Sequence, residues 1–281
     1  KRGCSMKKFH DIWVFFFMIS AFILVLLGIS CKILPLQDPF QTDMTKSLQY
    51  PSINNLFGTD ILGRDIFSRV LYGIQVSVVL SMITTILSVC VGLLIGLTAG
   101  YFGGIPDTII TIFTSIFQGL PATIIMITVA AMMGGGYYAL LFSMVITSWT
   151  GFSRIVRGEV LKLKTADYII VGKSMGASNI RIIFYYIFPA VCHNLIIVFA
   201  QRIAAFILSI AGLSYLGLGT HPPTPDLGGM INEARNYYRR QPMTIIAPGA
   251  VLLMISLGIN YFAEWLRENF FFKQSIKTGE S

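Results

Sequence analysis

The sequence has little charge for its length. Only 12% of its 281 residues are Asp, Glu, Lys or Arg, whereas 54% are hydrophobic and the mean hydropathy is +0.71. Charged residues make up about a quarter of an ordinary globular protein. A chain with half that share must hide its apolar surface from water or place it in lipid, so the composition excludes an ordinary cytosolic enzyme.

Residues that build catalytic and metal sites are also scarce. The three histidines lie far apart without an HExxH pattern, and the cysteines form no CxxC pair and are interpreted as small core residues. Gly172-Lys173-Ser174 imitates the end of a phosphate-binding loop, but Asp167 stands where that motif needs glycine. We therefore predict no catalytic residue, no metal and no cofactor in this chain. The cysteines are Cys4, Cys31, Cys90 and Cys192.

Long charge-free gaps indicate membrane spans. No charged residue occurs between Arg69 and Asp107 or between Asp107 and Arg154. A bilayer core of about 30 Å needs roughly 20 apolar residues per helix, so these gaps can hold several spans. We predict an all-α polytopic membrane protein with about six transmembrane helices. Their predicted ranges are 13–31, 76–100, 109–133, 137–153, 189–211 and 243–263.

The net charge is +8, but the basic residues lie between spans rather than on one polar module, so we reject the nucleic-acid interpretation. We interpret the excess as a signal for the orientation of the chain in the membrane. With the N-terminus inside, inner segments carry 13 Lys or Arg and outer segments seven. This bias favours cytoplasmic N- and C-termini. The first apolar run resembles a signal peptide but lacks a good cleavage site, so we expect a retained first helix.

Glycines and prolines mark packing faces and breaks. Gly92, Gly96 and Gly100 recur every four residues, which places them on one helix face where another helix can approach closely. Glycine runs at 103–104 and 134–136 predict turns between spans.

The outer loop 32–75 carries two acid-before-base pairs at helical spacing. They are Asp60 with Arg64 and Asp65 with Arg69. Spacing alone favours a solvated helix start that leads into the second span, because such pairs contribute only a few tenths of a kcal/mol each.

The stretch 154–189 alternates basic and apolar residues on the predicted cytoplasmic side. We expect short helices at the membrane surface, broken near Gly176-Ala177-Ser178. Composition leaves two interpretations equally open: a lipid-surface element, or a docking site for a soluble partner.

Four blocks of the chain carry motifs of a known kind. They are Phe57–Gly73, Ala99–Gly104 with Asp107, the stretch from Ile170 to Pro189, and Leu213–Gly219 with Pro222–Pro225 and Met230–Ala234. Together they resemble the inner-membrane permease subunits of ABC importers for dipeptides, oligopeptides, nickel and metal chelates, specifically the second, C-type permease. In the third block the family carries Glu-Ala-Ala, then glycine, then an ending in proline; here Ile170-Val171-Gly172 occupies the Glu-Ala-Ala positions, and Gly176 and Pro189 are kept.

The resemblance implies a permease that forms half of a translocation path in the bacterial inner membrane. The implied partners are a second homologous permease, two ATPase subunits that bind ATP and Mg²⁺, and an extracytoplasmic binding protein. It favours the docking interpretation of 154–189, with Ile170 in place of the family glutamate. The implied docking and coupling residues are Asp167, Tyr168, Ile169, Ile170, Val171, Gly172, Gly176, Ala177 and Pro189. Rival interpretations are an intramembrane enzyme, a secondary transporter, and a channel or scaffold subunit.

Two further expectations concern the path. Arg202 is the single charge inside a predicted span, so it either pairs locally or faces the path and meets an anionic group. The run Ser209–Gly212 resembles nickel-type members and leans towards a metal or metal chelate over a peptide. We divide the chain into residues 1–75 with the N-terminal tail, first helix and outer loop, a five-helix core at 76–265, and a cytoplasmic tail at 266–281.

Overall fold

The computed structural model describes the backbone of residues 2–278 and the side chains of residues 13–31 and 33–268. Within this part the chain is helical, and only an isolated bridge between Thr59 and Asp65 has β geometry. The all-α prediction is confirmed. Two compact units form: residues 1–82, 131–140 and 200–281 make the first, and residues 83–130 and 141–199 make the second.

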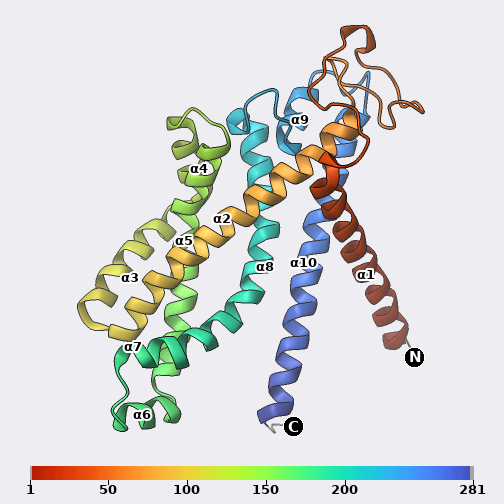
Figure 1. The fold of residues 1–281 in the computed structure, drawn as a ribbon. Coiled ribbons are helices and arrows are strands. Elements are labelled where there is room, and N and C mark those ends of the chain that lie inside the picture. The colour runs from red at the N-terminus through yellow and green to blue at the C-terminus, as the bar shows by residue number, and fades with distance from the viewer. Residues whose placement is uncertain (1, 279–281) are drawn as a thin grey trace. The chain divides into compact units, whose positions relative to one another are not determined.

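The first unit holds both ends of the described chain (Figure 1). In α1 (Arg2–Ile29) and α10 (Met243–Thr278) the backbones approach closely, because Gly258 faces Phe17 and Ala21 without a side chain between them. A buried apolar cluster joins the start of α2 (Ile66–Phe102) to the end of α8 (Phe188–Leu213), to α9 (Leu227–Ala234) and to α10. The remaining elements of the first unit are η1 (Ser30–Lys32), η2 (Met44–Lys46) and η4 (Ser214–Leu218).

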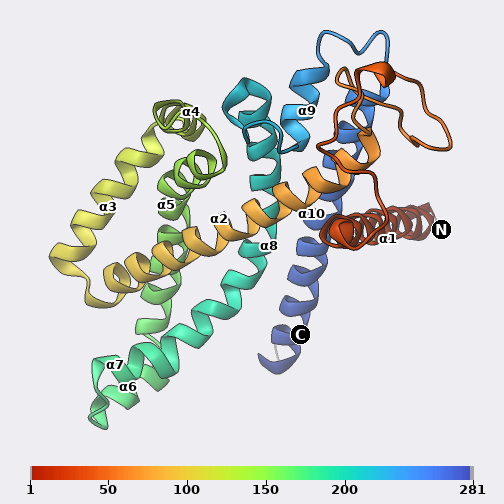
Figure 2. The same ribbon diagram turned by 45° about the horizontal axis from the view of Figure 1, so that its top comes forward.

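The second unit contains a sharp bend, visible in Figures 1 and 2, between α3 (Gly104–Gly119) and α4 (Ala122–Met132). These helices meet at 87°. Leu120 is extended because the ring of Pro121 disfavours helical geometry in the preceding residue. The span predicted over 109–133 is therefore not one continuous helix but a pair of helices with a bend between them. The unit also contains most of α5 (Tyr137–Lys164), α6 (Asp167–Ser174), α7 (Asn179–Ile182), η3 (Ile183–Ile187) and the start of α8 (Phe188–Leu213).

Four described helices are long and apolar enough to cross a membrane, or five if the bent pair counts as one span. Trp13–Ile29 is a shorter apolar helix, so six spans stays a prediction. The helix α2 (Ile66–Phe102) starts before the expected residue 76, and α5 continues beyond residue 153 to Lys164. The predicted turn at 134–136 is confirmed, since all three glycines adopt positive φ.

The glycine face of α2 packs directly on α5 within the second unit. A Cβ atom built on Gly96 would lie 2.6 Å from the Ser153 carbonyl oxygen and 2.7 Å from Val156 Cβ. One built on Gly100 would lie 2.7 Å from Val160 Cβ. The helices are therefore held at a distance that leaves no room for a methyl group.

We expect Gly96→Ala to destabilise the protein by about 1–3 kcal/mol, because the added methyl must push α5 away. Gly158→Ala is the matched control, since its Cβ would meet nothing within 4 Å and alanine favours the helix. Thermal unfolding in detergent measures both. Equal midpoints for the two variants would contradict close packing at Gly96.

Candidate functional site: a coupling region and an ion cluster

The predicted coupling residues lie in α6, in the turn that follows it and at the start of α8. Asp167 to Gly172 fall in α6, Gly176 and Ala177 in the turn that follows, and Pro189 at the start of α8. Figure 1 shows α6 and α7 as short helices between the long helices α5 and α8. The expected break near Gly176 is present.

A glycine-dependent cap ends α6. Gly176 has φ +82°, its N–H donates to the Lys173 carbonyl at 2.9 Å, and the Ala177 N–H donates to the Gly172 carbonyl at 3.1 Å. This pair of bonds is the Schellman arrangement, whose left-handed residue is normally glycine. The Ser178 hydroxyl then accepts from the Arg181 N–H at 3.3 Å and caps α7. The chain thus stops one helix and starts the next within four residues.

One side chain anchors α6, and the apolar residues around it face outwards. Ile169 is 1% exposed and belongs to the buried cluster that includes Val160 and Ile182. Because its neighbours have no such cover, α6 presents an apolar surface on a firmly held backbone. We call this surface the α6 face; it consists of Tyr168, Ile170, Val171 and Met175.

Tyr101, at the end of α2, links three parts of the second unit. Its hydroxyl donates to Asn179 Oδ1 at 2.7 Å, and its carbonyl accepts from Lys164 Nζ at 2.6 Å. Lys173 Nζ lies 5.3 Å from the ring centroid, within cation–π range. The buried Tyr101 therefore connects α2 to α5, α6 and α7.

An ion pair ties the first turn of α3 to α5. Arg157 Nη2 donates to Asp107 Oδ2 at 2.8 Å, and Arg157 Nε donates to Asp107 Oδ1. Asp107 also suits the positive end of the α3 dipole. The sequence places Asp107 with the Ala99–Gly104 block but gives no sign of its ion pair with Arg157.

Pro189 coincides with a local change of helix geometry. The Phe188 N–H donates to the Ile183 carbonyl, five residues earlier, which makes η3 a π turn. A proline has no N–H to donate and its ring crowds the carbonyl four residues before it. The wider turn before Pro189 accommodates both effects without ending the helix.

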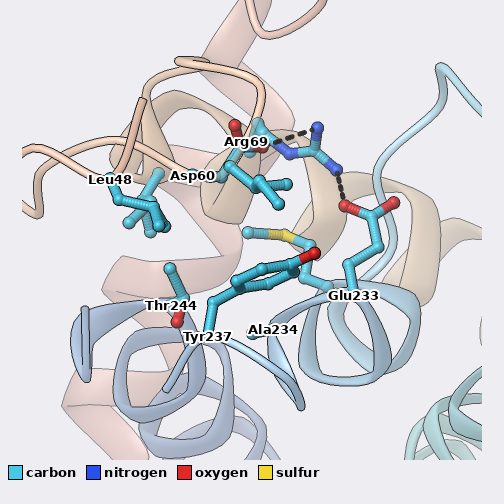
Figure 3. Close-up of a pocket in the computed structure, with 10 residues that line it drawn as sticks. Leu48, Asp60, Arg69, Glu233, Ala234, Tyr237 and Thr244 are labelled. Carbon is cyan, nitrogen blue, oxygen red and sulfur yellow. Dashed lines mark hydrogen bonds and ion pairs between the residues drawn. The ribbon is translucent and has the colours of Figure 1, made fainter. Parts of the chain in front are cut away.

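In the first unit, two arginines and two carboxylates form an ion cluster. Figure 3 shows one of the arginines, Arg69, with Asp60 and Glu233. Asp60 Oδ2 accepts from Arg64 Nε at 2.6 Å and lies 3.2 Å from Arg69 Nη1. Glu233 Oε2, on α9, accepts from Arg64 Nη2 at 2.8 Å and from Arg69 Nη2 at 3.1 Å. Arg64 and Arg69 are 4% and 2% exposed, so each buried guanidinium has two carboxylate partners.

The predicted solvated helix start at these residues is wrong. The Asp60–Arg64 pair exists, but it lies in a loop before α2. Asp65 does not pair with Arg69; it accepts from the Ser68 N–H at 2.8 Å and from the Ser68 hydroxyl at 2.7 Å, so it caps the first turn of α2. Burial rather than solvation determines the role of the charges.

Glu233 was not predicted as a partner of these arginines, because 169 and 164 positions separate it from them. The one hint in the sequence is that Arg64 and Arg69 lie in the block Phe57–Gly73 and Glu233 in the block Met230–Ala234, both of which resemble the permease family. Burial raises the pKa of the Glu233 carboxyl, and the Arg64 guanidinium opposes that rise. Glu233 and Arg69 also line a small pocket with Leu48, Tyr237 and Thr244 (Figure 3).

Two further expectations concern Arg202 and metal binding. Arg202 lies on α8 with an exposed side chain. Among the described residues, no group of three or more His, Cys, Asp or Glu side chains is arranged to hold a metal ion.

The helical architecture, together with the four sequence blocks that resemble permeases, defines an inner-membrane transport component. The family described as binding-protein-dependent transport system inner membrane component matches residues 92–274, and the chain belongs to it. It is a multi-pass protein of the inner membrane and a permease subunit of an ABC importer.

Named relatives cover most of the chain. It is 34% identical to a glutathione transport system permease protein of Pectobacterium atrosepticum, over 88% of this chain and 83% of the relative. It is 31% identical to a dipeptide transport system permease protein of Alkalihalophilus pseudofirmus, over 94% and 86%. A solved amino acid ABC transporter with histidines has the same fold, with a TM-score of 0.57 and 15% identity over 72% of this chain and 94% of that one.

We expect Asp60→Asn to destabilise the protein by about 3 kcal/mol, because it leaves two buried guanidiniums with one charged partner. Asp43→Asn is the matched control. Asp43 pairs at 3.2 Å with Lys46, which is 55% exposed, and such surface pairs contribute about 0–1 kcal/mol. Thermal unfolding in detergent compares them, and an Asp60→Asn midpoint as high as that of the control would exclude a stabilising ion cluster.

Proposed function

We propose that this chain is one of two permease subunits of a peptide-type importer, and that it couples the translocation path to ATPase subunits through α6. The family and the relatives named for glutathione and dipeptide transport support the peptide class. The prediction of nickel or a metal chelate as the substrate, made from Ser209–Gly212, gains no support from these relatives. ATP and Mg²⁺ would bind to the partner subunits, and an extracytoplasmic binding protein would deliver the substrate.

The α6 face carries the coupling part of the proposal. Val171 is 54% exposed and Met175 is 82% exposed, whereas Ile169, the α6 residue that packs into the core, is 1% exposed. A short helix with an apolar outer face can seat in a groove on a partner. Because Ile169 and the Tyr101 contacts fix α6 to α2, α5 and α7, movement of a docked ATPase would move these helices together.

The exposure of Ile170 supports docking without the family glutamate. Ile170 is 51% exposed and therefore available to a partner, but as an apolar side chain it can contribute only burial. Docking in this protein would then depend on apolar area at Ile170, Val171 and Met175 rather than on a charged contact.

We expect Val171→Glu to weaken ATPase association by about tenfold or more, because docking would bury a new charge. Met44→Glu is the matched control: Met44 is 69% exposed on the outer loop, so the same kind of change should leave association intact. Co-purification of the ATPase subunits and binding-protein-stimulated ATP hydrolysis provide the readouts. Retention of both by Val171→Glu would show that the α6 face is not the docking site.

Arg202 is proposed to face the path and to meet the carboxylate of a peptide. The positive guanidinium on α8 suits a substrate with a free C-terminal carboxylate. We expect Arg202→Gln to slow uptake of a dipeptide into proteoliposomes about tenfold, and to have little effect on the same dipeptide with an amidated C-terminus.

The uptake experiment also tests the substrate class. Reconstituted importer with its binding protein should accumulate dipeptides or glutathione in an ATP-dependent manner and should not accumulate Ni²⁺. Uptake of Ni²⁺ alone would contradict the peptide class. Uptake without the ATPase subunits would favour a secondary transporter and would contradict the coupling role of α6.

A further inference from the structure

Basic residues on the predicted outer side run against the usual bias of membrane proteins towards inner Lys and Arg, and three of the six described here have a carboxylate partner. Lys46 pairs with Asp43 at 3.2 Å, and the ion cluster neutralises Arg64 and Arg69. The remaining described outer cations lie between α9 and α10, and all are exposed. Within the described residues none of them forms an ion pair. They are Arg235, Arg239 and Arg240.

We call residues 235–240 the outer arginine turn; its backbone is held in place. The Tyr237 N–H donates to the Ala234 carbonyl, and the Arg240 N–H donates to the Tyr237 carbonyl, both at 2.9 Å. Gln241, which follows, is fully buried, and its Nε2 donates to the Gln49 carbonyl of the outer loop at 2.5 Å. Arg239 Nε donates to the Tyr238 hydroxyl at 3.4 Å. Because none of the three guanidiniums has a carboxylate partner among the described residues, they contribute no ion pair to this part of the fold.

The surroundings of the turn have the composition of a protein interface. Tyr238 is 47% exposed within the turn. Tyr50 is 69% exposed and follows Gln49, the residue to which Gln241 is bonded, and Ile53 in the same loop is 97% exposed. Arginine and tyrosine are enriched at protein interfaces, whereas lysine is depleted. The outer arginine turn contains no lysine.

From these observations we propose that the outer arginine turn receives an acidic patch on the extracytoplasmic binding protein. The inference rests on the proposed importer function and on the predicted orientation. Arginine's planar fork of donors pairs with carboxylates in a bidentate manner. Positive charge at the docking surface would also attract an acidic partner over distance and speed encounter.

The test measures association of the binding protein with the complete importer in nanodiscs. The triple variant Arg235→Gln, Arg239→Gln, Arg240→Gln should associate about tenfold more slowly than wild type at low salt, and the difference should shrink at about 0.5 M NaCl. Replacing the same three arginines by lysine keeps the charge and should keep the rate within about threefold of wild type. Lys46→Gln removes one paired outer charge and should not change the rate.

An unchanged rate in the triple glutamine variant, an equal loss in Lys46→Gln, or slow association in the triple lysine variant would each overturn the proposal. Neutral phosphatidylcholine nanodiscs separate the alternative of lipid headgroups. If the difference between wild type and the glutamine variant disappears there, the arginines bind anionic headgroups and the proposal fails. Failure of the importer function is distinguishable, because the wild-type complex would then bind neither the ATPase subunits nor the binding protein.

Discussion

The hydrocarbon interior of a bilayer offers no hydrogen-bond partner and no screening for charge, and the long charge-free gaps between Arg69 and Arg154 follow from that constraint. Where charges are buried among the described residues, they are paired or hydrogen-bonded. The two buried arginines of the first unit each have two carboxylate partners. In the second unit Arg157 and Asp107 satisfy each other across two helices. The exposed break between α6 and α7 lies in a stretch of mixed polar and small residues, where water can satisfy the freed backbone groups.

Features set by local chemistry could be predicted from the sequence. The four-residue spacing of Gly92, Gly96 and Gly100 defines one face whatever the helix packs against, so only the identity of α5 was missing. The break at Gly176 follows from a residue type that ends helices, and the cap bonds involve only residues 172–177. Such features depend on neighbours in the sequence, which is why spacing and residue type suffice.

Features that depend on tertiary pairing could not be predicted in this way. Helical spacing coupled Asp65 to Arg69, but the fold pairs Arg69 with Glu233, which is 164 positions away. Asp65 instead accepts from the Ser68 N–H at the start of α2, a local alternative that spacing did not separate from an ion pair. The bend at Leu120 is a different case. Pro121 is a local residue that favours a break there, but the uninterrupted apolar run around it is equally typical of one continuous span. Docking surfaces depend on other chains, and no single sequence contains them.

The turn at Gly176 has a stereochemical consequence. Its φ of +82° belongs to the mirror image of the conformations that L-residues prefer, so the backbone at this position has the handedness of a D-amino acid. A Cβ of L-configuration would meet nothing within 4 Å, which means that chirality rather than space restricts the position. A D-alanine introduced by chemical synthesis would therefore fit here with less strain than the natural L-alanine, although both carry the same methyl group.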